Sequence, residues 1–281
     1  MTICICTACG IEHANTARPP VRCAICSDDR QYVPPAGQQW TSLTEMAGQH
    51  RGSFTELEPD LYALRVTPSF AIGQRGLLVR TPAGNVLWEP PGFVDQELID
   101  AATALGGVAA VASSHPHLVG VSITWSKAFD GVPVYVAEAD RRWIRRPDDA
   151  ITLWSGVREV LPGATLHQCG GHFPGSAVLH WSAGAAGAGA LLCGDTLMVG
   201  ADRATVSFMR SYPNLIPLPE RLVRQIAGTV QPLAFDRIYG AFDRGVIETG
   251  GAAAVQASAR RYIGWIRDEI RDPDEASASG A

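Results

Sequence analysis

The sequence has no run of 18 apolar residues, and its basic segments, such as DRRWIRRPDD, are balanced by acidic neighbours. A membrane-spanning helix needs about 20 apolar residues, so we expect no membrane span. The formal net charge of −5 argues against a nucleic-acid surface. The opening MTICICTACG lacks the basic and apolar regions of a secretory signal, so we expect a cytoplasmic protein.

The seven cysteines do not form the even set typical of a secreted disulfide framework, and five of them lie in the first 26 residues. Four have paired spacing, with two residues inside each pair and thirteen between the pairs: Cys6, Cys9, Cys23 and Cys26. Four thiolates at this spacing are typical of a closed structural zinc site. Cys4 is a competing ligand for Cys6, and a redox pair or buried free thiols are the alternatives.

Hydrophobic residues make up 46% of the 281-residue chain, which is a globular composition. We expect a zinc-knuckle segment and linker at 1–38, a main domain at 39–272 and a disordered tail at 273–281. The main domain alternates short apolar strands with turns, which predicts a layered α/β fold. The predicted helices are 95–107, 138–146, 218–230 and 251–272.

Three segments place polar residues where predicted strands end: SSHPHLVG, CGGHFPGS and ALLCGD. Alternation along an extended chain puts His115 and His117 on one side, where two imidazoles suit a divalent metal. His172 follows two glycines that allow close backbone approach. Asp195 ends an apolar strand, where burial of an unpaired carboxylate is costly and a metal would remove the cost.

HPH, followed by GGHFPGS and then GDT, resembles the metallo-β-lactamase superfamily, whose first motif is HxHxDH. The stretch NVLWEPPG is similar to an early strand of that family, with Glu89 near the usual Asp. The resemblance covers residues 60–245. It implies a four-layer αββα sandwich of two mixed sheets, with the metal site at one edge. It also implies that the ligands of one metal are His115, His117, His172 and Asp195.

The sequence departs from the family pattern at the second metal site. Val119 and Gly120 stand where HxHxDH has Asp and His, and the late family His is replaced by the stretch Phe242, Asp243 and Arg244. We therefore expect one active-site ion, either zinc or iron. Without the usual Asp, the candidates for a general base are Asp195 and Asp243.

The stretch 201–219 is rich in proline and aromatic residues and follows soon after Asp195. It predicts a pocket wall in which Arg210, Tyr212 and Asn214 contact the substrate. The alternatives are a packed connection to the next helix or a surface that covers a partner in a homodimer.

These observations predict a metal-assisted hydrolase that acts on a small-molecule ester, thioester, lactone or phosphoester. One alternative is a mononuclear non-haem iron oxygenase, because the superfamily includes the persulfide dioxygenases and two His with one Asp resemble their ligand set. Another is a degenerate, non-catalytic binding module. We expect a small-molecule substrate and no nucleic-acid or membrane partner.

Overall fold

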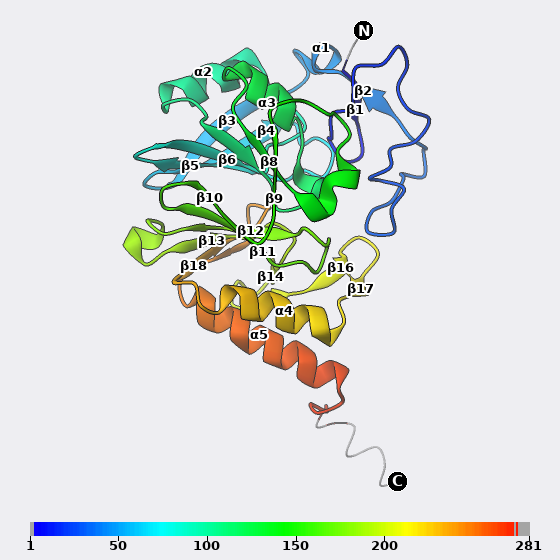
Figure 1. Ribbon diagram of the computed structural model, residues 1–281. Helices are drawn as coiled ribbons and strands as arrows, with labels where there is room; N and C mark the ends of the chain where they lie inside the picture. The colour runs from blue at the N-terminus through cyan, green and yellow to red at the C-terminus, as the bar shows by residue number, and fades with distance from the viewer. Residues whose placement is uncertain (1–2, 273, 275–281) are drawn as a thin grey trace.

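A computed structural model describes residues 3–272 and Asp274, so the predicted disordered tail lies, apart from Asp274, outside the described residues. Two β-sheets face each other and helices cover both outer faces (Figure 1). This arrangement confirms the predicted αββα sandwich. No helix in residues 3–272 is long and apolar enough to cross a membrane.

The first sheet has seven strands, antiparallel from β3 to β6 and parallel from β6 to β9. In spatial order they are β3 (Arg51–Glu58), β4 (Leu61–Thr67), β5 (Gly76–Thr81), β6 (Gly84–Trp88), β7 (Ala110–Ala112), β8 (Val134–Ala137) and β9 (Ile151–Trp154). The central strands are continuous apolar runs because they are buried on both faces.

The second sheet has six strands and is also mixed, because β13 and β18 pair in parallel. In spatial order they are β10 (Val157–Leu161), β11 (Ala164–Gln168), β12 (Ala177–Trp181), β13 (Ala190–Leu192), β18 (Arg237–Tyr239) and β19 (Val246–Ile247). Three two-stranded ribbons stand outside the sheets: β1 (Ile5–Cys6) with β2 (Trp40–Thr41), β14 (Met198–Val199) with β15 (Val206–Ser207), and β16 (Met209–Ser211) with β17 (Ile216–Pro217).

Three apolar clusters hold the four layers together. One lies between the sheets, one between the first sheet and its helices, and one between the second sheet and its helices. The helices on the first sheet are α2 (Gln96–Ala104) and α3 (Ser122–Ala128), and those on the second are α4 (Glu220–Val230) and α5 (Gly251–Ile266). The short α1 (Leu43–Met46) leads from the N-terminal segment into β3.

Two predicted helices end earlier than expected. Residues 138–146 form only a 3-10 turn, η2 (Glu138–Trp143), because Pro147 disfavours a helical conformation in the residue before it. The last helix ends at Ile266 rather than at residue 272, since Asp268 has φ +59° and the amide of Glu269 donates to the carbonyl oxygen of Gly264.

The N-terminal segment is not a separate lobe. It runs along one side of the first sheet and reaches toward β16 and β17 (Figure 1). Its four paired cysteines form their own apolar cluster, against which Ile72, Val119 and Trp143 of the main domain pack. The predicted domain division at residue 38 remains a proposal, and the two parts share a buried interface.

Candidate metal centre

The three predicted histidines and Asp195 meet at one edge of the two sheets. His115 and His117 follow β7, His172 follows β11, and Asp195 follows β13. One ligand atom from each residue lies within 4.8 Å of the other three. Residues separated by 80 positions in the sequence therefore share one site.

The backbone around the first two histidines differs from the sequence prediction. His115 is extended, but His117 lies inside the 3-10 turn η1 (Pro116–Leu118), so the two do not share one side of an extended chain. Pro116 starts this turn because its fixed φ suits the first helical position. The turn brings His117 Nδ1 to 3.3 Å from His172 Nε2.

Hydrogen bonds fix the orientation of two of the imidazoles. His172 donates through Nδ1 to the carbonyl oxygen of Met209 at 3.1 Å, which leaves Nε2 for a ligand. The Nδ1 of His115 lies 2.7 Å from Ser114 Oγ. Its Nε2 lies 3.7 Å from Asp195 Oδ2 and has no partner among the described residues.

The charges of these groups fit a bound dication. Burial lowers the pKa of His115 and His117 well below their usual value and lowers that of His172 to about 4, so the imidazoles are neutral. Burial also raises the pKa of Asp195 to about 7, and its Oδ1 has no partner among the described residues. Neutral imidazoles, a partly buried carboxylate and unpaired donor atoms are the features of a metal site.

Glu89 lies behind the metal ligands, at the end of β6, with φ +55°. It accepts a hydrogen bond from Ser114 Oγ, which also lies next to His115 Nδ1. Burial raises the pKa of Glu89 to about 8. Sequence reasoning placed Glu89 near this position but missed Ser114, whose only signal is that it precedes His115.

The residues at the positions of the family's second metal site have other contacts. Val119 packs against the four-cysteine cluster. Gly120 has φ +48°, and a β-carbon there would lie 1.9 Å from the carbonyl oxygen of Pro90. A histidine side chain therefore has no room at this position.

The second predicted general base, Asp243, is not in the metal-site group among the described residues. Its two carboxylate oxygens accept hydrogen bonds from Arg65 Nε at 2.8 and 2.9 Å. Its Oδ1 also lies 3.6 Å from Arg75 Nη1, and its side chain is 57% exposed. The geometry thus gives Asp243 a role in an ion-pair cluster.

Of the three predicted substrate contacts, Tyr212 is the one that lies beside the metal-site residues. Its hydroxyl donates to the carbonyl oxygen of Asp195 at 3.2 Å, and its ring centroid is 5.8 Å from that of His172. Arg210 forms a bidentate ion pair with Asp29 instead. The Asn214 amide donates to carbonyl oxygens of the same N-terminal segment.

The four predicted cysteine ligands form a second compact group. Cys6 Sγ lies 3.6 Å from Cys26 Sγ, and Cys9 Sγ lies 3.8 Å from Cys23 Sγ. A tetrahedral zinc ion with bonds of about 2.3 Å separates its sulfurs by about 3.8 Å, so the spacing fits zinc. Cys4 is buried outside the group, which leaves Cys6 as the candidate ligand.

Polar side chains surround these sulfurs, as is common in structural zinc sites. The amide of Gln38 donates to Cys6 Sγ at 3.1 Å, and His13 Nε2 lies 3.6 Å from Cys23 Sγ.

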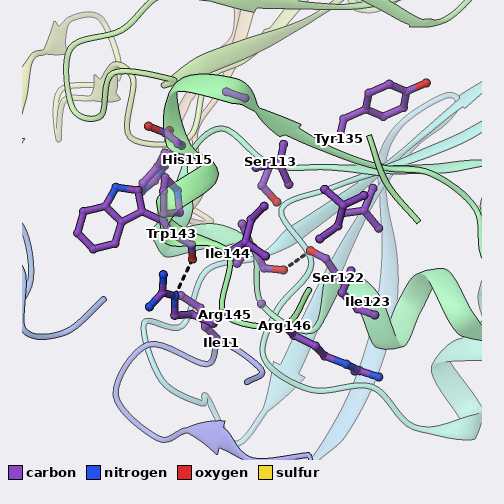
Figure 2. Close-up of a pocket in the computed structure, with 18 of the residues that line it drawn as sticks. Ile11, Ser113, His115, Ser122, Ile123, Tyr135, Trp143, Ile144, Arg145 and Arg146 are labelled. Atoms are coloured by element: carbon purple, nitrogen blue, oxygen red, sulfur yellow. Dashed lines mark hydrogen bonds between the residues drawn. The ribbon is translucent and has the colours of Figure 1, made fainter. Parts of the chain in front are cut away.

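A cavity of about 60 Å³ borders His115 (Figure 2). Its lining includes the aliphatic residues Ile11, Ile123 and Ile144 and also charged residues such as Glu12 and Arg146. Trp143 Nε1 in its wall has no hydrogen-bond partner among the described residues. The cavity therefore has an unsatisfied donor in its wall and lies next to one candidate metal ligand.

The sequence matches no protein-family model. It is 46% identical over 269 residues to the uncharacterized protein YmaE of Bacillus subtilis (strain 168), an alignment that covers 95% of this chain and 97% of YmaE.

Solved metallo-β-lactamase structures share the fold. DIM-1 metallo-β-lactamase has a TM-score of 0.56 at 11% identity, over 75% of this chain and 98% of its own. FIM-1 from Pseudomonas aeruginosa, in its mono-zinc form, has a TM-score of 0.53 at 12% identity, over 74% and 96%. TTHA1623 in a di-iron-bound form has a TM-score of 0.50 at 21% identity, over 68% and 96%.

Proposed function

Since this chain belongs to the same family as YmaE of Bacillus subtilis and has the metallo-β-lactamase fold, we propose that it is a mononuclear metal-dependent hydrolase. Its proposed substrate is a small-molecule ester, thioester, lactone or phosphoester. The observation that carries the proposal is the convergence of His115, His117, His172 and Asp195, with buried donor atoms left unpaired.

The proposed ion would be held by His115, His117 and His172, with Asp195 beside them. A metal bound there would lower the pKa of a water ligand and polarise a carbonyl or phosphoryl oxygen. Zinc and iron both fit this donor set, since FIM-1 was solved in a mono-zinc form and TTHA1623 in a di-iron-bound form.

The chain's own residues supply orientation and a proton acceptor. Ser114 and the carbonyl oxygen of Met209 hold the rings of His115 and His172. Asp195 Oδ1 is unpaired among the described residues, and this carboxylate is the proposed proton acceptor. The hydroxyl of Tyr212 fixes the backbone of Asp195.

One ion rather than two follows from the packing at Val119 and Gly120. The first contacts the cysteine cluster and the second has room only for hydrogen, so neither contributes a ligand. The aliphatic residues that line part of the cavity beside His115 support a substrate with a small apolar group. The cysteine cluster is proposed to hold a structural zinc ion, which requires reduced thiols.

The test combines metal analysis with hydrolysis assays. Untagged protein should contain two metal ions per chain and hydrolyse at least one chromogenic ester, thioester, lactone or phosphodiester. His172→Ala should lose one ion and this activity. His180→Ala is the matched control, because His180 bonds to the carbonyl oxygen of Ala234 outside the site.

An unchanged metal content in His172→Ala would contradict the ligand assignment. A fully loaded protein that hydrolyses none of the four classes would favour the binding module, and iron at the histidine group would favour oxygen chemistry.

A further inference from the structure

Arg30 links the four-cysteine segment to the histidine site. It lies four residues after Cys26, and its side chain is only 6% exposed. Its Nε donates to the carbonyl oxygen of His172 at 2.7 Å. Its guanidinium carbon lies 4.1 Å from the ring centroid of Phe173, the next residue. One side chain therefore holds the backbone of a metal ligand from outside the main domain.

The other contacts of Arg30 leave its side chain little freedom. Nη1 donates to Asp28 Oδ1 at 2.5 Å, and the carbonyl oxygen of Arg30 accepts from Ser211 Oγ at 3.0 Å. Ser211 lies in β16, the strand whose Met209 accepts the Nδ1 hydrogen of His172. The ring and the backbone of His172 are thus held by two segments that are themselves bonded to each other.

The N-terminal segment also contacts the turn that carries the other two histidines. The amide of Glu12 donates to the carbonyl oxygen of Gly120 at 3.2 Å, and Val119 packs against the cysteines. The cysteine segment is therefore bonded to both ligand-bearing turns, in addition to its contacts with β16 and β17.

The charge of Arg30 and its hydrogen bond have opposite effects on metal binding. A guanidinium is permanently positive and repels a dication, so its charge alone weakens metal binding. The hydrogen bond to His172 and the stack on Phe173 fix a ligand before the metal arrives, which strengthens binding. Outer partners of metal ligands typically change affinity by about 10- to 100-fold.

We infer that Arg30 is a positioning residue that couples the four-cysteine segment to metal binding at the histidine group. The inference rests on the proposed metal at that group. It assigns the N-terminal segment a role in the active site, through the bond from Arg30 Nε to the His172 carbonyl oxygen. The folded cysteine segment is thus needed for full metal affinity at a site that contains none of its residues.

The test measures Co²⁺ binding to the full chain. Cobalt in the thiolate site gives intense charge-transfer bands, and cobalt in a His and Asp site gives only weak visible bands, so the sites are read separately. Chelator competition then gives the Kd of the histidine site.

Arg30→Met keeps the aliphatic stem, and Arg30→Lys restores the charge and one donor. Arg267→Met is the control, because Arg267 pairs with Glu220 of α4, in the helix layer of the second sheet.

We expect Arg30→Met to weaken Co²⁺ binding at the histidine site by about 10- to 100-fold. The charge-transfer bands of the thiolate site should keep their full intensity. The Kd of Arg30→Lys should lie between those of Arg30→Met and the parent, and the Kd of Arg267→Met should equal that of the parent. An unchanged or tighter Kd in Arg30→Met would overturn the inference and leave the proposed function standing. A parent protein with no cobalt at the histidines would instead overturn the proposed function, and the inference with it.

Asp28→Asn covers the case in which Arg30→Met fails to fold, which loss of the thiolate bands would reveal. It removes the carboxylate that holds Nη1 and keeps Arg30 in place. We expect Co²⁺ to bind several-fold more weakly at the histidine site, and an unchanged Kd would overturn the inference.

Discussion

A β-carbon on Gly120 would lie 1.9 Å from the carbonyl oxygen of Pro90, so this position has room for a hydrogen alone. Gly120→Ala must shift the backbone after β6 and also strains a residue with φ +48°. We expect a loss of about 2 to 4 kcal/mol in the free energy of unfolding, measured by urea denaturation.

Gly131→Ala is the matched control, because Gly131 has φ +75° but no atom within 4 Å of the added carbon. It should cost about 1 kcal/mol, the backbone strain without the clash. Equal losses in the two variants would show that the contact with Pro90 is unimportant. Gly120→His should likewise gain no metal ion.

Glu12 fixes the N-terminal segment to α3. Its carboxylate accepts from the amide of Ile123 at 2.5 Å and from Thr124 Oγ1 at 2.7 Å, and it pairs with Arg146. Glu12 is buried and the side chain of Arg146 is only 12% exposed, so Glu12→Gln should lower the free energy of unfolding by about 3 kcal/mol. Thermal and urea unfolding measure the change.

Asp29→Asn gives the contrast, since the Asp29 side chain is 58% exposed in its pair with Arg210. Exposed pairs contribute about 0 to 1 kcal/mol, so this variant should remain close to the parent. A similar loss in both variants would argue against the burial of Glu12 as the cause.

The raised pKa of Glu89 predicts that the stability of the protein depends on pH. Its folded pKa of about 8 lies above its unfolded value, so the folded state holds the proton more tightly. The stabilisation is fully present below about pH 4 and is lost as the pH rises through 8. In metal-free protein, Glu89→Gln should therefore show a smaller loss of stability between pH 5 and about 8.5.

Asp243 provides a control, because its pKa is shifted in the opposite direction to that of Glu89. Its hydrogen bond with Arg65 lowers the pKa of this carboxyl, so its contribution is present at neutral pH and is lost as the pH falls through the lowered value. Asp243→Asn should leave the slope above pH 5 unchanged. Parallel curves for the parent and Glu89→Gln would show that Glu89 is not the titrating group.

The double substitution Cys23→Ser/Cys26→Ser should remove one zinc ion per chain and lower Tm, because a small segment depends on its metal for folding. Elemental analysis and calorimetry measure these changes. Cys4→Ser alters a buried thiol outside the group and should keep both ions. Loss of zinc in Cys4→Ser would reassign the ligand that we give to Cys6.

The fold and the grouping of His115, His117, His172 and Asp195 could be predicted because their signals are local. Short apolar runs bounded by turns define strands, and HPH, GGHFPGS and GD each lie where a strand ends. The conformation of His117 could not be predicted, because Pro116 permits both an extended chain and a 3-10 turn. Tertiary contacts select the turn.

The contacts of Arg30 and Glu12 could not be predicted, for a different reason. Each residue lies a few positions after a cysteine pair, but the cysteine motif does not indicate which distant group the charged side chain contacts. Their partners lie 142 and 134 residues away, at His172 and Arg146. Only the folded chain brings such groups together, so the docking of the N-terminal segment had no sequence signal.

The 142 residues between Arg30 and His172 also set an order in time. At about 5 to 20 residues per second, the ribosome makes His172 about 7 to 28 seconds after Arg30. All four thiols of the N-terminal segment are synthesised before that moment. A metal ion that meets the nascent chain therefore encounters the four thiols first, and all three imidazoles only later.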